Sequence, residues 1–408
     1  MIPSQTLPIH LDLALIEPST KTLYPTPTQS LLRASAIANR ECLQPFSTFA
    51  YQGPVDRSFQ SKVILPQWQL ESQTPPQLAE GLSSQVELVR SSSDTKEVWV
   101  SMNTQFGVYR PASRKWTYVS RIVRNTDMIA DHLFVTSSGE LWGRTNWDWS
   151  QEHSVTKGIP ILSRFNESTQ EFELVEETAI TSLNLALEPI RRPQVLLDDN
   201  DTFWIIVEKN GIFHYSPMKH SIERVAELLD DFELSQAVLS QDGSIYLRRF
   251  EWAEKNRFRL PKDLLFKLSP ATAKLETVTM PNQEWPVFSG MLVDRVGRLW
   301  LGSIGYRDVD LTWHLIHPAP QEFFDLVDSG GYSYLWAPPE LILESSNGVL
   351  WFRRYLDTSG WAEGTAWYNP KTGEGCLFTN QAANVVEDKE EQLWLLVDGK
   401  LYKHPLKP

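Results

Sequence analysis

Cysteine and long apolar runs are scarce in this chain of 408 residues. Its two cysteines, Cys42 and Cys376, form no C-x-x-C spacing, which argues against a zinc site. One disulfide between them and two unpaired thiols are both compatible with the sequence. No apolar stretch approaches the roughly 20 residues of a membrane-spanning helix. Residues 1–15 also lack a basic segment followed by an apolar core, so we expect a cytoplasmic chain, or an extracytoplasmic one whose leader was removed.

Positive charge and enzyme motifs are also in short supply. The net charge of −13 creates a field that repels phosphate backbones, so nucleic acid is not an expected partner. The sequence has no P-loop, no G-x-G-x-x-G, no H-E-x-x-H and no G-x-S-x-G, and no cofactor is predicted. The run Asp198-Asp199-Asn200-Asp201 has the residue types of a calcium loop. It lacks the EF-hand spacing and the distal glutamate, which favours an Asx turn over a metal site.

What the chain has in abundance is tryptophan, 16 in all, and much of it belongs to a repeat. A short apolar strand that carries an aromatic residue recurs at intervals of 42 to 62 residues. Its seven aromatics are Trp99, Trp142, Trp204, Tyr246, Trp300, Trp351 and Trp394. Four of them follow a glycine three residues earlier, in sequences typical of hairpin turns: Gly139, Gly243, Gly297 and Gly348.

A second segment of alternating apolar and polar residues follows each aromatic and contains a proline that closes a strand, as at Pro111, Pro217, Pro270, Pro370 and Pro405. Each unit therefore predicts four strands. Strand A precedes the turn, strand B carries the aromatic, and strand C precedes the proline. Strand D ends at Val119, Val175, Val225, Val278, Val327 or Phe378 in the first six units.

Four short strands repeated seven times predict an all-β fold, a single seven-bladed β-propeller of four-stranded blades, rather than an unrelated β-sandwich. The seventh unit ends at Pro408 without a strand D, and an open sheet edge favours aggregation. We therefore expect Lys62–Leu70 to complete the last blade by pairing with the strand of Leu401 and Tyr402. The predicted domains are an extension, partly irregular, over 1–60 and the propeller over 61–408.

The repeat also resembles a known family. Asp-x-x-Gly-x-Leu-Trp followed by Gly-Leu-x-x-Tyr-x-Pro is similar to the two-component-regulator propeller repeat, which builds sensor regions of bacterial hybrid histidine kinases. The match is closest in QDGSIY, DRVGRLWLGS and DGKLYKHP, and it covers about Val86 to Pro405. The resemblance implies a propeller and a sensing role. The kinases carry two propellers, a membrane helix and kinase domains, whereas this chain holds one propeller's worth of repeats.

The repeats differ most between strands B and C. From the aromatic of strand B to strand C, units 2, 4, 5 and 6 span 23, 22, 17 and 17 residues, against 9 to 11 in the other three. All B–C connections of a propeller emerge on one face, so four long loops should surround one mouth of the channel. Arginine and tryptophan are enriched in binding hot spots. The candidate ligand-binding residues are Arg144, Trp147, Trp149, Arg248, Arg249, Trp252, Arg307, Trp313, Arg353, Arg354 and Trp361.

Strand alternation refines these positions. Arg249 and Arg354 should face away from the strand B aromatic, and Arg248 and Arg353 should share its side. Such arginines can clamp a carboxylate or phosphate group. The predicted function is a non-catalytic binding or sensing module for a peptide, glycan or protein ligand on the B–C face. In the competing interpretation the loops pack on one another, with arginines stacked on tryptophans and paired with aspartates.

Two other functions stay open. One is a propeller enzyme of lyase or hydrolase type, such as a streptogramin-inactivating lyase. Its acid and base would come from His153 with Asp148 or Glu152. The other is a structural subunit of a multiprotein assembly, with the same face as its interface.

Overall fold

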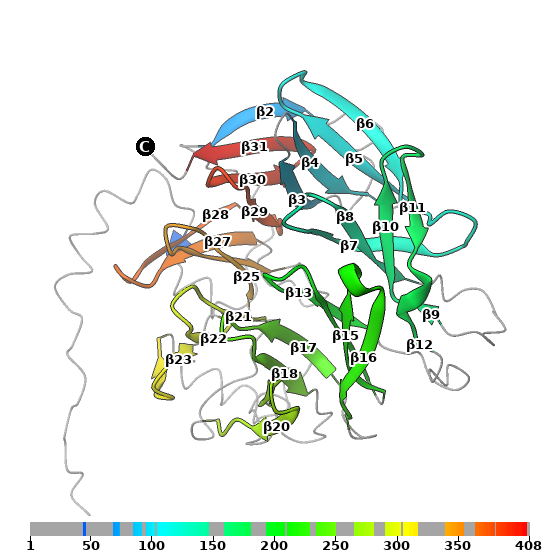
Figure 1. Cartoon of the computed structure of the whole chain (residues 1–408). Helices are drawn as coiled ribbons and strands as arrows, with labels where there is room; N and C mark the ends of the chain where they lie inside the picture. The colour runs from blue at the N-terminus through cyan, green and yellow to red at the C-terminus, as the bar shows by residue number, and fades with distance from the viewer. Residues whose placement is uncertain are drawn as a thin grey trace, which may run out of the picture. The chain divides into compact units, whose positions relative to one another are not determined.

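The repeat builds the predicted propeller, although the strands of one unit differ from the prediction. The computed structural model describes residues 44–45, 68–73, 85–91, 95–102, 104–146, 159–180, 193–208, 210–228, 234–249, 265–280, 290–302, 305–316, 339–354, 364–379 and 381–405. All of them belong to the compact unit Glu41–Pro408. Seven four-stranded antiparallel blades form a ring in this unit, a seven-bladed β-propeller (Figure 1).

The first four blades follow one another along the chain. Blade I contains β3 (Gln85–Ser91), β4 (Lys96–Ser101), β5 (Gln105–Arg110) and β6 (Lys115–Ser120). Blade II contains β7 (Ile129–Val135), β8 (Leu141–Asn146), β10 (Leu162–Asn166) and β11 (Glu171–Leu174). Blade III contains β13 (Gln194–Leu197), β14 (Phe203–Val207), β15 (Gly211–Ser216) and β16 (Ser221–Ala226). Blade IV contains β17 (Leu234–Leu239), β18 (Ile245–Arg249), β19 (Leu265–Ser269) and β20 (Lys274–Thr277).

The last three blades close the ring. Blade V contains β21 (Met291–Val293), β22 (Leu299–Leu301), β23 (Gly305–Arg307) and β24 (Trp313–Leu315). Blade VI contains β25 (Glu340–Glu344), β26 (Leu350–Arg354), β27 (Gly364–Asn369), β28 (Glu374–Thr379) and the added β1 (Gln44–Pro45). Blade VII contains β29 (Val385–Glu387), β30 (Gln392–Val397), β31 (Lys400–Pro405) and β2 (Gln69–Gln73). Outside the blades, β9 (Ile159–Pro160) pairs with β12 (Ala179–Ile180), and η1 (Glu176–Thr178) and η2 (Pro217–Lys219) are single 3-10 turns.

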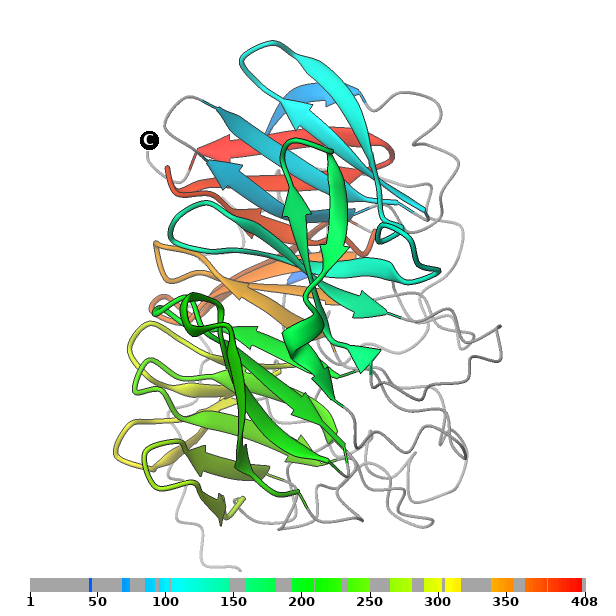
Figure 2. The same cartoon turned by 45° about the vertical axis from the view of Figure 1, so that its right-hand side comes forward.

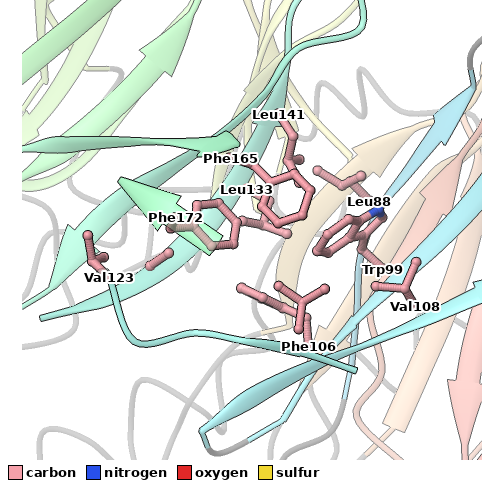
Figure 3. Packing of buried hydrophobic residues seen from close by; sticks show 11 residues of the cluster. Leu88, Trp99, Phe106, Val108, Val123, Leu133, Leu141, Phe165 and Phe172 are labelled. Carbon is pink, nitrogen blue, oxygen red and sulfur yellow. The ribbon is translucent and has the colours of Figure 1, made fainter. Parts of the chain in front are cut away.

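The core lies between blades. Strands A of neighbouring blades contact one another around the channel, and strand B presents its aromatic to the next blade. All seven repeat aromatics are buried, with at most 8% of their surface exposed. Figure 3 shows one such interface, in which Trp99 and Phe106 of blade I face Phe165 and Phe172 of blade II. Large aromatics in these positions each remove roughly 150–250 Å² from water, which makes the ring cohesive.

A repeated device holds the A–B turns. The carboxylate of Asp294 accepts hydrogen bonds from the backbone N–H groups two and four residues later, and from Nε1 of Trp300 at 2.8 Å. Asp388 does the same for Trp394, also at 2.8 Å. Asp198, in the run with calcium-loop residue types, does so for Trp204 at 3.2 Å, so this run forms the expected Asx turn. The acidic residue of the repeat thus fixes the turn and its tryptophan together.

The ring closes as predicted, through strand β2. Leu70 pairs with Tyr402 and Ser72 with Leu401, so β2 supplies the fourth strand of blade VII. The strand begins seven residues later than Lys62 and continues past Leu70 to Gln73. Figures 1 and 2 both show this blade beside blade I. Glu71 joins the two blades, because its carboxylate lies 2.6 Å from Nζ of Lys403 and accepts a hydrogen bond from the hydroxyl of Tyr109.

A second N-terminal segment adds to blade VI. Gln44 and Pro45 of β1 pair with Leu377 and Cys376 of β28. Cys376 is 4% exposed and is disulfide-bonded, and the chain's only other cysteine is Cys42. Of the two thiol states that the sequence left open, the structure therefore has the disulfide.

The strand prediction is wrong in blade V. Strand C was expected about 17 residues after Trp300, at His317, and strand D at Val327; both positions lie outside the described residues. Instead β23 follows β22 after three residues, and β24 completes the blade by Leu315. A tight turn makes this hairpin, since N–H of Asp308 bonds to the carbonyl of Thr312 and Leu311 adopts φ +73°. The B–C connection of blade V is therefore short, and long connections remain in blades II, IV and VI.

Candidate functional site

Three arginines occupy equivalent positions at one end of the channel. Arg144, Arg248 and Arg353 each stand two residues after the strand B aromatic, in the three blades with long B–C connections. Their cross-strand neighbours on the strands A are, respectively, Asp131, Gln236 and Glu340. In an antiparallel blade, the end of strand B and the start of strand A lie on the B–C face. We call this end of the channel, defined by the three arginines and their neighbours, the channel mouth.

Arg144 and Arg353 are held by internal partners from neighbouring strands and blades. The guanidinium of Arg144 forms two bonds to the carboxylate of Asp131, at 2.8 and 3.1 Å, and donates to the carbonyl of Pro193 in blade III. Arg353 bonds to Glu340 at 2.8 Å. It also donates to the side chains of Gln85 in blade I and Asn384 in blade VII. These contacts fit the competing interpretation of packed arginines, because both side chains tie blades together.

Strand alternation holds in blade VI. Arg353 lies on the Trp351 side, where it reaches Asn384 of blade VII, as expected. Arg354 is on the other side and only 2% exposed. In blade IV, Arg248 pairs across the sheet with Gln236, and Arg249 pairs with Leu234. Burial lowers the pKa of Arg248 to about 10, so its guanidinium remains charged at neutral pH.

His132 is the residue at this mouth that the sequence interpretation missed. Asp131 and Leu133 pair with successive residues of β8, so His132 is the extra residue of a β-bulge, and it adopts φ +52°. Left-handed backbone is costly for residues other than glycine, and such strain and bulges concentrate at functional sites. The side chain of His132 is exposed. Its signal in the sequence was faint: a polar Asp-His pair that interrupts the alternation of strand A.

Charges from three blades surround this imidazole. Solvent reaches His132, but the surrounding ring displaces part of the water around its imidazole; this desolvation lowers the pKa of His132, and the positive charge of Arg144 lowers it further. Glu87 and Asp131 act in the opposite direction, and Arg353 adds to the lowering. Glu87 is itself the bulge residue of β3 and accepts a hydrogen bond from Nε2 of Gln85 at 3.3 Å. At neutral pH the imidazole is thus uncharged, with one nitrogen that donates and one that accepts.

The mouth does not contain a hydrogen-bonded His–carboxylate pair among the residues that the structure describes, since His132 takes part in none of their ion pairs. The nominated cluster of His153, Asp148 and Glu152 lies outside those residues. Within the same described ranges, no group of three or more His, Cys, Asp and Glu residues is placed to hold a metal ion. No helix there is long and apolar enough to cross a membrane.

Arg307 and Trp313 do not belong to the mouth, which corrects the prediction. Because the hairpin of blade V is short, both flank its C–D turn, on the opposite face. The guanidinium of Arg307 lies 5.9 Å from the ring centre of Trp313, whose Nε1 donates to the carbonyl of Thr279 in blade IV. Both residues line a cleft of about 570 Å³ between these blades. The remaining candidates, Trp147, Trp149, Trp252 and Trp361, lie outside the described residues.

The solved structures that resemble this chain support its propeller architecture. No protein-family model matches the sequence, and no curated protein is similar to it. Among solved structures, Ycf48 from Cyanidioschyzon merolae is 10% identical with a TM-score of 0.51, over 83% of this chain and all of that one. A catalytically inactive virginiamycin B lyase from Staphylococcus aureus with quinupristin is 15% identical, with a TM-score of 0.50, over 83% and 99%.

The third neighbour comes from sensor proteins. An extracellular domain assigned to a hybrid two-component system of B. thetaiotaomicron is 14% identical with a TM-score of 0.50. The likeness covers 82% of this chain and 42% of that domain, so this chain matches less than half of its length. Sensor domains and enzymes thus share the fold. At these identities the likeness shows the propeller architecture alone.

Proposed function

We propose that this propeller is a non-catalytic binding or sensing module, which takes a carboxylate-bearing peptide or glycan at the channel mouth. One observation carries the proposal: His132 is held in left-handed backbone at the mouth, exposed and uncharged, among arginines from alternate blades. Strained polar residues that face a channel serve stability poorly and recognition well. The resemblance of the repeat to sensor propellers supports the same function.

The ligand chemistry follows from the charges. Arg144 and Arg353 are held by Asp131 and Glu340, so they form a rigid rim. Arg248 stands at the equivalent position opposite the neutral Gln236. A carboxylate bound near Arg248 would therefore meet a cation whose neighbour across the sheet is uncharged, and charge-assisted hydrogen bonds are the stronger kind. The imidazole of His132 can donate to a second oxygen of the same ligand.

Calorimetric titration of the full chain tests the proposal. The acidic ligands are D-galacturonate and N-acetyl-L-aspartate, and their uncharged analogues are D-galactose and N-acetyl-L-asparagine amide. We expect the acids to bind more tightly, and Arg248→Met or His132→Gly to weaken them about tenfold. Glycine accepts the left-handed backbone, so His132→Gly should keep the fold. The matched control is Arg224→Met on the outer strand β16, where the guanidinium is half-exposed.

Three outcomes would contradict the proposal. They are equal affinity for acids and neutral analogues, no binding of either acid, or unchanged binding by both variants. Conversion of a bound ligand, followed by mass spectrometry, would instead support the lyase or hydrolase alternative, with His132 as a base. The observation that favours this alternative is the neutral imidazole of His132 at the channel mouth, because a neutral imidazole can accept a proton from a ligand.

We propose further that the chain works in an oxidising compartment. Cys376 is buried and disulfide-bonded, and such bonds persist in extracytoplasmic surroundings but are rare in the cytosol. Thiol labelling of denatured protein from the native source, without reductant, should detect no free cysteine. Two labelled cysteines would place the protein in a reducing compartment.

A further inference from the structure

A cleft of about 910 Å³ opens between blades II and III, away from the residues of the channel mouth. The A–B turn of blade II, its C–D turn and η1 form one wall. The turn around η2 of blade III forms the other. The A–B and C–D turns of blade II lie at the opposite end of the strands from Arg144, whereas η1 follows β11 at the same end as Arg144. The lining of the cleft includes neither Arg144 nor His132, so the cleft is separate from the site proposed above.

Two buried aromatic side chains in this cleft carry polar atoms without partners. Tyr215 is 1% exposed, its ring packs against Trp142 and Phe203, and its hydroxyl has no hydrogen-bond partner among the described residues. The charges that act on this hydroxyl are those of Glu177 and Arg164, both in the cleft wall, so the hydroxyl end points into the cleft. Burial raises the pKa of Tyr215 to about 12, which keeps the hydroxyl protonated.

Trp142 is the exception among the repeat tryptophans. The indole N–H groups of Trp99, Trp204, Trp300, Trp351 and Trp394 all donate to a side-chain oxygen. Trp142 has Thr136 at the position of the turn aspartate, and that hydroxyl bonds to Ser138 and Glu140 instead. Its Nε1 is buried without a partner among the described residues. Unsatisfied buried groups need an explanation, and a ligand or water held in the cleft supplies one.

The charge of the cleft is negative. Four glutamates line it against two arginines: Glu140, Glu167, Glu173 and Glu177 against Arg90 and Arg164. Three of the glutamates are paired with arginine, at 2.6, 2.5 and 3.2 Å. Glu177, with 45% of its side chain exposed, has as its ion-pair partner in the described part of the chain only His220, at 3.6 Å. One carboxylate beside the Tyr215 hydroxyl thus lacks a permanent cation.

We propose that the cleft between blades II and III binds a primary alkylammonium group, such as a lysine side chain or a diamine. Glu177 accepts hydrogen bonds from the ammonium group, and the Tyr215 hydroxyl donates to a carbonyl or amine of the same ligand. The methylene stem lies along Met218, which is 90% exposed at the rim. The acidity of the whole chain draws cations toward this site.

Titration of the full chain with N-acetyl-L-lysine amide and 1,4-diaminobutane, followed by calorimetry, tests this site. N-acetyl-L-norleucine amide is the uncharged analogue. We expect Glu177→Gln to weaken lysine amide binding about tenfold, because it removes a charge-assisted bond without changing shape. Tyr215→Phe, which removes one neutral hydrogen bond, should weaken it about threefold to tenfold. Stronger binding of the lysine derivative than of the diamine identifies a peptide as the source, and the reverse identifies a polyamine.

The matched control is Glu223→Gln on β16, where a second exposed glutamate lies 3.5 Å from a histidine, His214, outside the cleft. Its affinity for lysine amide should equal that of the wild type. Circular dichroism establishes that the variants fold. The proposal is overturned if norleucine amide binds as well as lysine amide, if neither amine binds at about 10 mM, or if Glu177→Gln and Glu223→Gln behave alike.

Discussion

The two faces of this propeller are built on different principles. On the A–B face one arrangement recurs: an acidic or hydroxyl side chain bonds to its own turn and accepts a hydrogen bond from the tryptophan six residues later. Asp294 and Asp388 accept from the backbone of the turn, whereas the Ser345 hydroxyl donates to it. On the B–C face the strand B position two residues after the aromatic differs between blades. It is arginine in blades II, IV and VI, and serine, isoleucine, glycine or leucine in the other four.

This difference separates stability from recognition. Residues that repeat around the ring hold blades together, because every blade faces the same packing problem. Residues that break the repeat have no such shared task, and in this chain they include His132 and Arg248. The faces are not wholly distinct, since Arg144 and Arg353 also join blades at the channel mouth. Conversely, the A–B arrangement lacks an acceptor at Trp142, and that tryptophan borders the cleft between blades II and III.

Removing the closing strand should have the largest effect on the regular part of the ring. Deletion of residues 1–73 takes away β2 and leaves β31 as an open edge, so we expect a loss of about 5 kcal/mol or more in free energy of unfolding. Deletion of 1–55 spares β2 but removes Cys42 and β1, and should cost about 2–4 kcal/mol through the lost disulfide. Urea titration measures both. Equal midpoints for the two truncations would mean that β2 does not close the ring.

The repeat aromatics come next. Trp300 is 1% exposed and packs between blades V and VI, so Trp300→Ala should cost about 3–5 kcal/mol. The control is Trp313→Ala on the outer strand of the same blade, where the partly buried side chain should cost about 1 kcal/mol. A variant at Trp300 no less stable than the one at Trp313 would show that the inner aromatics do not hold the ring.

The sequence predicts this repeated part well and the variable part poorly. Seven aromatics, their glycine turns and the missing strand D suffice to predict the ring and its closure by an N-terminal strand. The alternation on strand B also predicts the side of Arg353 correctly. The prediction fails in blade V because the hairpin of β23 and β24 uses Leu311, rather than glycine, in left-handed backbone.

Side-chain pairing is the other feature that the sequence does not predict. The bonds of Arg144 to Asp131 and of Arg353 to Asn384 join residues whose proximity depends on the ring and its bulges. His132 gave a weak signal for the same reason, since a bulge shifts the strand register by one residue. Sequence alternation assumes regular strands, so it cannot place a bulge residue.

Low pH should weaken the hydrogen bonds that link the turn carboxylate to its A–B turn and to the tryptophan. Burial alone would raise the pKa of Asp388, but hydrogen bonds from Lys96 and Trp394 lower it below its ordinary value. A depressed carboxyl pKa stabilises the fold above the unfolded value of about 3.9, and this contribution is lost as the pH falls through the folded pKa. Asp388→Asn should therefore cost about 2 kcal/mol at pH 7. The difference from wild type, followed by thermal unfolding, should shrink below about pH 4; a constant difference would assign the effect to packing alone.

The smallest change in stability should come from giving the indole N–H of Trp142 the acceptor that it lacks. Thr136→Asp would place a carboxylate beside the N–H of Glu140, which already bonds to Thr136, and in reach of the Trp142 indole. Thr136 is 3% exposed, and burying a carboxylate is costly, but the side chains of Asp294 and Asp388 are fully buried at the equivalent position, where Arg298 and Lys96 pair with them. We therefore expect a gain of about 1 kcal/mol in free energy of unfolding. Ser345→Asp is the control, because Trp351 already has an acceptor there, and it should gain nothing. If Thr136→Asp instead destabilises the chain while Ser345→Asp does not, the A–B turn of blade II differs from the others in backbone as well as in side chain.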